Sequence, residues 1–159
     1  MKKIIIVFLL ILTSCGYQPL YKTDQNIKNL NINEVIFSGD QKINDVIFRK
    51  LPFILVKNDE CLNKLSLESK KEIKITSKNS KGQALSYRTI IKVKILVLNS
   101  NGDIIDQKIV QKNFSYNADE NKFKFKEYQD KIEKNLIDTI VEDVIIHLTY
   151  IVLGDCYTC

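Results

Sequence analysis

The sequence predicts an α+β fold, a two-layer sandwich in which a roughly four-stranded, mostly antiparallel sheet carries two helices on one face. Two periodicities carry this prediction: four stretches alternate apolar and polar residues, while two others repeat apolar residues every three or four positions. Their order along the chain is β-α-β-β-β-α. With 159 residues, 45% hydrophobic and 27% charged, the chain has the size and composition of one globular domain.

One strand and one helix are expected first. Leu30 to Phe37 begins with alternating residues, and Ser38-Gly39-Asp40 is expected to close the strand. Asp40 is also the expected N-cap of the following helix, which Pro52 limits. The residues at helical spacing are Ile43, Val46, Ile47, Lys50 and Leu51.

Three strands are expected after a polar segment from Lys57 to Lys70. Their ranges are 72–76, 84–99 and 104–116, and they form an antiparallel meander. Asn101-Gly102 predicts a type I′ turn between the last two strands, because both residues tolerate a positive φ angle. In the middle strand we expect odd-numbered residues to be buried, which leaves the even-numbered ones on an opposite, partly basic face.

A long final helix is expected to start between Lys124 and Glu127 and to pack on the sheet. His147, the only histidine, is expected at the edge of its apolar stripe. With both helices on one face of the sheet, the other face stays available. The stripe, at a period of 3.6 residues, comprises Ile132, Leu136, Ile137, Ile140, Val141, Val144, Ile145, Leu148, Ile151 and Val152.

The first fifteen residues have the layout of a secretory signal. Met1-Lys2-Lys3 precedes nine uninterrupted apolar residues, which are too few to span a bilayer, since a spanning helix needs about 20. We expect residues 1–14 to be a cleaved signal peptide, residues 15–28 a lipidated tether and residues 29–159 a single α+β domain.

Leu12-Thr13-Ser14-Cys15 resembles the bacterial lipobox, in which the cysteine thiol receives diacylglycerol before cleavage makes it the first residue. The competing interpretation is an ordinary secretory protein with an unmodified thiol at Cys15. Two or three acyl chains would hold the protein permanently at a membrane, because each buried methylene contributes roughly 0.8 kcal/mol. Gly16, where inner-membrane lipoproteins often carry Asp, favours the outer membrane, with the folded part facing the periplasm.

Cys15-Gly16-Tyr17-Gln18-Pro19-Leu20-Tyr21 resembles the mature start of the alphaproteobacterial LptE lipoproteins, which assemble lipopolysaccharide (LPS). The element order and the stretch Ser86-Tyr87-Arg88 are similar to the same family. The resemblance implies a non-enzymatic protein that plugs the outer-membrane barrel LptD, assists its assembly and takes part in delivering LPS to the outer leaflet. The C-terminal Cys156-Tyr157-Thr158-Cys159 departs from the family pattern.

Basic residues on the expected strands are the candidates for contact with LPS or with the barrel. Arginine and lysine suit phosphates, arginine in a bidentate manner. An ordinary solvated sheet face and contact with acidic residues of a barrel lumen remain alternatives. The net charge is too small to suggest a nucleic-acid partner, since removal of Lys2 and Lys3 lowers it from +5 to +3. The candidates are Arg88, Lys92, Lys94, Lys108 and Lys112.

The remaining chemistry-bearing residues give little support to an enzyme. Cys156 and Cys159 could pair in an oxidising periplasm, which leaves Cys61 free. A thiol oxidoreductase normally carries its Cys-x-x-Cys motif at a helix start, whereas here it ends the chain. With one histidine and one cysteine pair, neither a metal nor another cofactor is expected. The alternative function is a general outer-membrane lipoprotein that binds another envelope protein or a cell-wall polymer.

Replacing Cys15 with serine tests the lipobox. We expect Cys15→Ser to accumulate as an unprocessed precursor, because the thiol is the acyl acceptor. Mass spectrometry of the membrane fraction measures both forms. Wild-type protein that begins at a residue other than Cys15, or that carries an unmodified Cys15, would contradict the lipoprotein interpretation.

Overall fold

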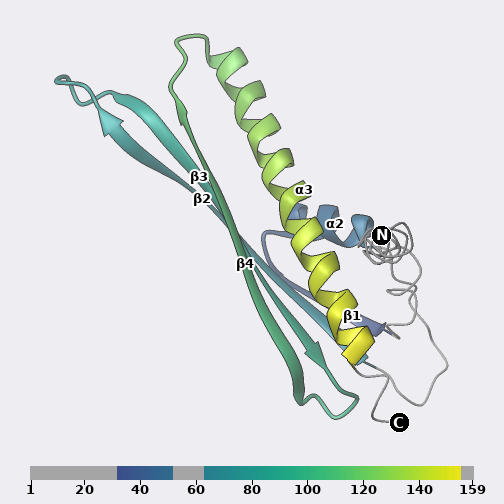
Figure 1. Cartoon of the computed structure of the whole chain (residues 1–159). Helices are drawn as coiled ribbons and strands as arrows, with labels where there is room; N and C mark the ends of the chain where they lie inside the picture. Colours follow the sequence, from purple (N-terminus) through teal and green to yellow (C-terminus); the bar gives the residue numbers. More distant parts are fainter. Residues whose placement is uncertain (1–31, 52–62, 155–159) are drawn as a thin grey trace, which may run out of the picture.

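The computed structural model describes residues 32–51 and 63–154, so Cys15, Cys61, Cys156, Cys159 and the expected signal peptide and tether lie outside the described residues. The element order β-α-β-β-β-α is confirmed (Figure 1). Among the described residues, no helix is both long and apolar enough to cross a membrane. The elements are β1 (Ile32–Gly39), α2 (Gln41–Lys50), β2 (Asn63–Lys78), β3 (Ala84–Leu98), β4 (Ile104–Asn117) and α3 (Lys122–Gly154).

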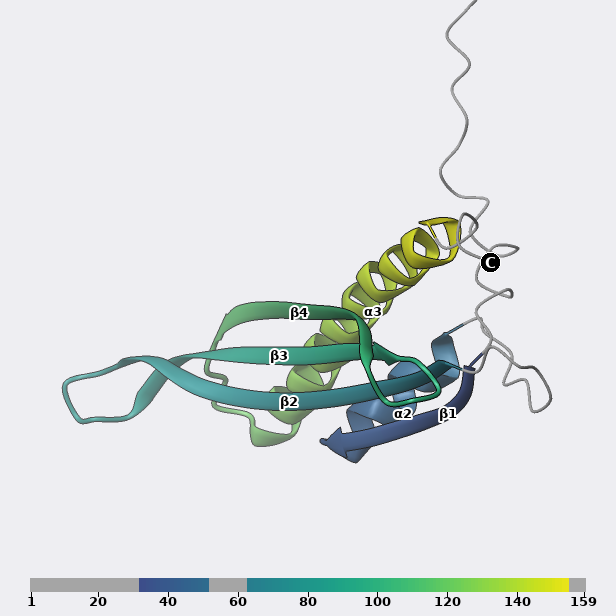
Figure 2. The ribbon, with the colours of Figure 1, turned by 90° about the horizontal axis from the view of Figure 1, so that it is seen from below.

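The four strands form one mixed sheet in the order β1-β2-β3-β4. β1 is parallel to β2, while the β2–β3 and β3–β4 pairs are antiparallel. Both helices lie on the same side of the sheet: α2 contacts β1 and β2, whereas α3 contacts β3 and β4 (Figures 1 and 2). The predicted two-layer α+β sandwich is therefore confirmed, and one face of the sheet carries no described helix.

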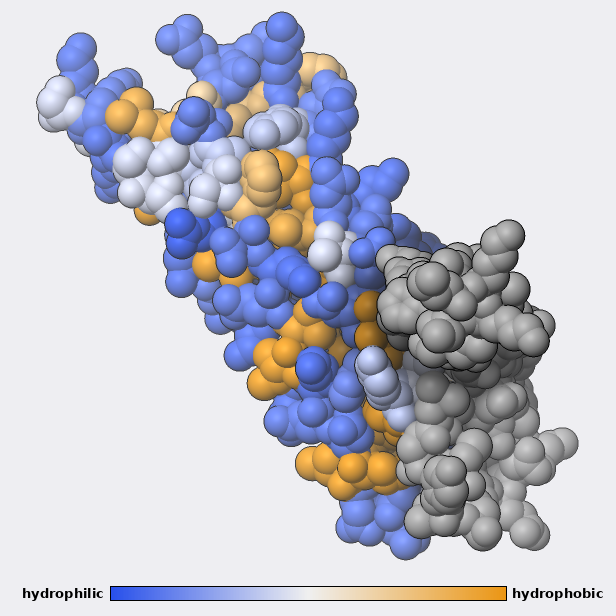
Figure 3. Space-filling view, in the orientation of Figure 1, coloured by the Kyte–Doolittle hydropathy of each residue, from blue (hydrophilic) through white to orange (hydrophobic). Residues whose placement is uncertain are grey.

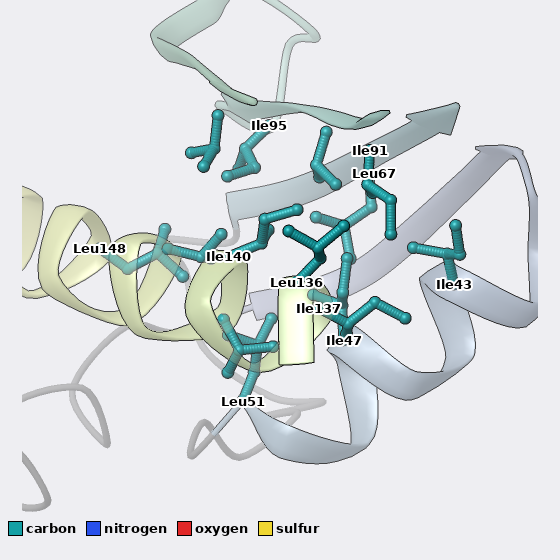
Figure 4. Close-up of a cluster of buried hydrophobic side chains, with 14 of the residues drawn as sticks. Ile43, Ile47, Leu51, Leu67, Ile91, Ile95, Leu136, Ile137, Ile140 and Leu148 are labelled. Carbon is teal, nitrogen blue, oxygen red and sulfur yellow. The ribbon is translucent and has the colours of Figure 1, made fainter. Parts of the chain in front are cut away.

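The core lies between the sheet and the two helices (Figure 4). α2 begins where predicted, because the Asp40 carboxylate accepts a hydrogen bond of 3.2 Å from the Ile43 N–H. α3 begins after Asn121, whose side chain accepts from the Phe123 and Lys124 N–H groups, each at 3.1 Å. The α3 stripe is confirmed by the burial of Ile132, Leu136, Ile137, Ile140, Val141, Val144 and Leu148.

Aromatic side chains close the core at the first turns of α3. Tyr87 and Tyr116 of the sheet pack against Phe125, and Tyr128 meets Tyr116 edge-on. The Tyr116 hydroxyl is also hydrogen-bonded to Thr89 at 3.0 Å. Figure 3 shows less hydrophilic surface in this region, between the β2–β3 hairpin and α3.

Two local predictions are wrong. β2 begins at Asn63, inside the polar segment expected to precede the strand, and it buries Leu65 and Leu67. The β3–β4 hairpin is present, but its turn is not type I′, because Gly102 has a φ of 90° and no described non-glycine residue has a positive φ. The Gly102 N–H donates to the Asn99 C=O at 3.1 Å, as in a type I turn followed by a left-handed glycine.

A buried carboxylate joins both helices to the sheet. Glu133 of α3 accepts hydrogen bonds from Lys42 of α2, at 3.1 Å, and from Lys71 of β2. Burial opposes ionisation of this carboxyl group, but the two lysines outweigh burial and hold the pKa of Glu133 below its ordinary value. Glu133 is therefore charged at neutral pH, and it holds α3 against both α2 and β2.

β1 ends at Gly39, where the chain turns sharply away from the sheet. Gly39 has a φ of 81°, and a Cβ atom added to it would lie 2.0 Å from the Ser69 carbonyl oxygen of β2. That carbonyl accepts a hydrogen bond of 2.9 Å from the Asp40 N–H, and the Ser69 hydroxyl donates to the Asp40 carbonyl at 2.9 Å. Only glycine satisfies both the positive φ and the close approach.

We expect Gly39→Ala to lower the free energy of unfolding by about 3 kcal/mol or more, since it combines a left-handed alanine with a backbone clash. Gly82→Ala is the matched control: Gly82 has a φ of 80° but open space where its Cβ would lie. This control isolates the conformational cost, about 1–2 kcal/mol. Urea unfolding of both variants measures the difference, and equal losses would contradict the role of the Ser69 contact.

Candidate functional site

The helix-free face of the sheet, called here the open face, carries three of the predicted residues. In β3 the residues Thr89, Ile91, Val93, Ile95 and Val97 are buried. Because side chains alternate along a strand, Arg88, Lys92 and Lys94 lie on the open face. Arg88 and Lys92 are exposed there, and Lys94 is half-buried. The predicted placement of these three residues is confirmed.

Two lysines of β2 join Arg88 and Lys92 in a cluster that we call the basic patch. Lys74 lies directly opposite Arg88 in the antiparallel register, and Lys70 lies opposite Lys92. Directly opposed residues have Cα atoms about 4.5–5.5 Å apart, and residues four apart on a strand are separated by about 13 Å. Lys70, Lys74, Arg88 and Lys92 therefore mark the corners of a narrow rectangle.

A single acidic residue lies within the basic patch. Glu72 accepts from Lys70 at 2.7 Å and from Lys74 at 3.2 Å. The Lys70 hydrogen bond, followed by that of Lys74, lowers the pKa of Glu72, and Glu72 in turn raises the pKa of Lys70. With four basic side chains and one carboxylate, the rectangle with its acid has a formal net charge of +3.

The cations of β3 are not neutralised by carboxylates. Arg88 donates from Nε to the Ser115 hydroxyl at 2.9 Å, which orients its guanidinium along β4. No ion pair between described residues includes Arg88, Lys92 or Lys94. Cations with no carboxylate partner are free to meet an anionic ligand without breaking an existing pair.

Lys108 and Lys112, predicted as contact residues together with Arg88, Lys92 and Lys94, do not lie on the same face as those three. Lys108 pairs with Ile95 and Lys112 with Ile91, and directly opposed residues share a face, so both lysines lie on the helix-covered side. Lys112 forms a 2.7 Å ion pair with Asp143 of α3. It links the edge strand to the helix.

Sequence reasoning missed Lys70 and Lys74 as partners of Arg88 and Lys92. Alternation along 72–76 indicates which face Lys74 occupies, but the pairing register of β2 with β3 decides which residues meet. The β2–β3 register is offset near the hairpin by bulges at Ile75/Ser77 and Ser77/Lys78. A pairing counted back from the turn alone would therefore be displaced.

The open face is apolar at its other end, towards the β3–β4 hairpin. Leu96 and Leu98 are half-buried, while Ile104 and Ile109 are 59% and 47% exposed. Ile104 lies opposite Leu98, and Ile109 lies opposite Lys94. The open face is therefore amphipathic along its length, cationic near the β2–β3 hairpin and apolar near the β3–β4 hairpin.

The other polar groups are used within the fold. His147 of α3 is hydrogen-bonded to Asp106 of β4 at the edge of the helix stripe. In the described part of the chain, no three His, Cys, Asp or Glu side chains are grouped so as to hold a metal ion. The arrangement of the open face is that of a binding surface for an anionic or amphipathic partner.

Comparison with known proteins identifies the fold. No family model matches the sequence, and no curated protein matches it at a significant level. The structure is similar to rare lipoprotein B from Shewanella oneidensis, with a TM-score of 0.61 and 13% identity, covering 77% of this chain and 98% of that one. It is also similar to a minor lipoprotein from Acinetobacter baumannii, with a TM-score of 0.58 and 13% identity, covering 76% and 92%. Lipoprotein B from Nitrosomonas europaea is likewise similar, with a TM-score of 0.61 and 10% identity, covering 90% of this chain and 97% of that one. This chain therefore has the fold of these bacterial lipoproteins.

Proposed function

We propose that the chain is a lipid-anchored outer-membrane lipoprotein of the LptE type. In this proposal it faces the periplasm, plugs the barrel LptD, assists its assembly and takes part in delivering LPS to the outer leaflet. The observation that carries the proposal is that a chain with a lipobox and the Cys15–Tyr21 motif folds like bacterial lipoproteins. No catalytic step is required of any residue.

The amphipathic open face supports contact with LPS. This molecule joins phosphate groups to acyl chains, so it needs cationic and apolar surface close together. The basic patch offers four cations, and the apolar end of the same face continues through Leu96 and Leu98. Lys94, between the two regions, would contact the boundary between headgroup and chains.

The partnership with the barrel is tested by purifying a tagged full-length chain from membranes. We expect one large β-barrel to be recovered in stoichiometric amount and to be identified by mass spectrometry as LptD. Depletion of the chain should reduce the amount of folded barrel in the outer membrane. Recovery of a different envelope protein or a cell-wall polymer, with normal barrel assembly after depletion, would favour the general lipoprotein instead.

Charge reversal tests the contact with LPS. We expect Arg88→Glu with Lys92→Glu to weaken binding of purified LPS at low salt by about a hundredfold or more, since two charge-assisted contacts at about 1.5 kcal/mol each sum to about 3 kcal/mol. Stability should change by less than about 1 kcal/mol, because both side chains are exposed. Titration of labelled LPS at several salt concentrations measures the affinity.

The matched control is Lys124→Glu with Lys134→Glu, which makes the same change in net charge at exposed positions of α3. We expect this control to bind LPS with nearly wild-type affinity. If both double variants lose affinity equally, net charge rather than the basic patch governs binding, and the assignment of the open face is wrong.

A further inference from the structure

The distal half of β2 is an unpaired sheet edge. The last pair between β1 and β2 joins Gly39 to Ser69, whereas β2 continues to Lys78. Beyond Ser69, β2 has β3 on one side and no described strand on the other. Figure 2 shows β1 ending well short of the β2–β3 hairpin. An edge of this kind presents free backbone donors and acceptors to an incoming strand.

The junction with β1 indicates which backbone groups face outward from this edge. The Ser69 carbonyl points towards the β1 side, because it accepts from the Asp40 N–H at 2.9 Å. Backbone groups alternate in direction along a strand, so Lys71, Ile73 and Ile75 direct their N–H and C=O groups away from β3, towards the unpaired edge of the sheet. None of the backbone hydrogen bonds between described residues outside the regular ladders involves these three residues.

The side chains along the edge alternate as well. Ile73 and Ile75 point to the helix side but are 45% and 51% exposed, since α3 packs on β3 and β4 and α2 packs beside β1. On the open face, Lys70 and Lys74 share the single carboxylate of Glu72. Lys71 also points to the helix side, but Glu133 already engages it.

Natural edges are usually protected by proline, by charged side chains, above all lysine, by a bulge or by an inward-pointing charge. Three lysines lie on this edge, but Glu72 engages Lys70 and Lys74, and Glu133 engages Lys71. The run from Lys70 to Ile75 contains no proline, and its first bulge comes after Ile75. Gly39 adds to this openness, because its left-handed turn directs the chain into α2 and leaves the line of β1 unoccupied by any described residue.

We propose that the edge from Lys70 to Thr76 accepts an extended segment of the β-barrel partner as an added strand, in line with β1. The identity of this partner rests on the proposed function. The added strand carries apolar residues over Ile73 and Ile75 and acidic residues beside Lys70 and Lys74, which complements the charge of the basic patch. A closed barrel has no free edge of its own, so the segment is a loop or a terminal arm of the barrel.

Residue-resolved hydrogen–deuterium exchange of the full chain, alone and in complex with the barrel, tests this proposal. We expect the amides of Lys71, Ile73 and Ile75 to exchange at least about tenfold more slowly in the complex, because they gain hydrogen bonds. The amides of Glu72 and Lys74 should be protected in both states, because they pair with β3. This alternation is a signature that simple covering of the surface does not produce.

Two substitutions at one position separate backbone pairing from side-chain contact. Ile73→Pro removes an N–H at the unpaired edge and leaves the hydrogen-bond ladder between β2 and β3 intact. We therefore expect recovery of the barrel to fall about tenfold or more. Ile73→Thr keeps the N–H and the strand propensity, so recovery should stay within about threefold of wild type. Loss with both variants or with neither would overturn the proposal of strand addition.

The remaining outcomes separate this inference from the proposed function. A wild-type complex without alternating protection overturns the added strand and leaves the barrel partnership standing. Absence of any barrel complex overturns both. Constant protection of the three amides in the free chain means that another part of this chain occupies the edge. Protection that rises with protein concentration means that a second copy occupies it. Either result also overturns the proposal.

Discussion

Five alternate residues of β3, from Thr89 to Val97, are at most 2% exposed and form the floor on which α3 packs. The constraint they impose is geometric. Once the odd-numbered side chains from Thr89 to Val97 are buried, the even-numbered ones beside them must lie on the other face. The position of Arg88 and Lys92 is thus a consequence of core packing. A shift of one residue in register would turn both cations towards the core, at a cost of several kcal/mol for each unpaired charge.

The helix layer is held to this floor by contacts of two kinds. Apolar residues of α2 and α3 fill the centre, while Glu133, Asp143 and His147 make polar contacts with Lys71, Lys112 and Asp106 along the strands. These polar contacts fix the position of α3 along the strand direction, which apolar packing alone leaves less defined. The basic side chains without an ion-pair partner therefore lie on the open face or at exposed positions.

Sequence periodicity predicts the parts of this fold in which many residues repeat one pattern. α3 and β3 were predictable because each buries at least five residues at a single period. β4 was harder to interpret, because only Val110 and Tyr116 of this edge strand are buried, so alternation did not reveal the face of Lys108 and Lys112. The start of β2 rests on Leu65 and Leu67 alone. The basic patch depends on the β2–β3 register, which arises from contacts between strands and is not encoded locally.

The parallel pairing of β1 with β2 has a consequence for how the chain folds as it is synthesised from its N-terminus. The β2–β3–β4 meander is joined by short turns, so its contacts are local and form quickly. β1 is synthesised first, yet its partner residues in β2 lie about thirty positions later, and Lys50 of α2 meets Asp138 only when α3 has been made. The first described strand of the chain is therefore the last to be secured, and until then its apolar side chains stay open to contact with chaperones or with other chains.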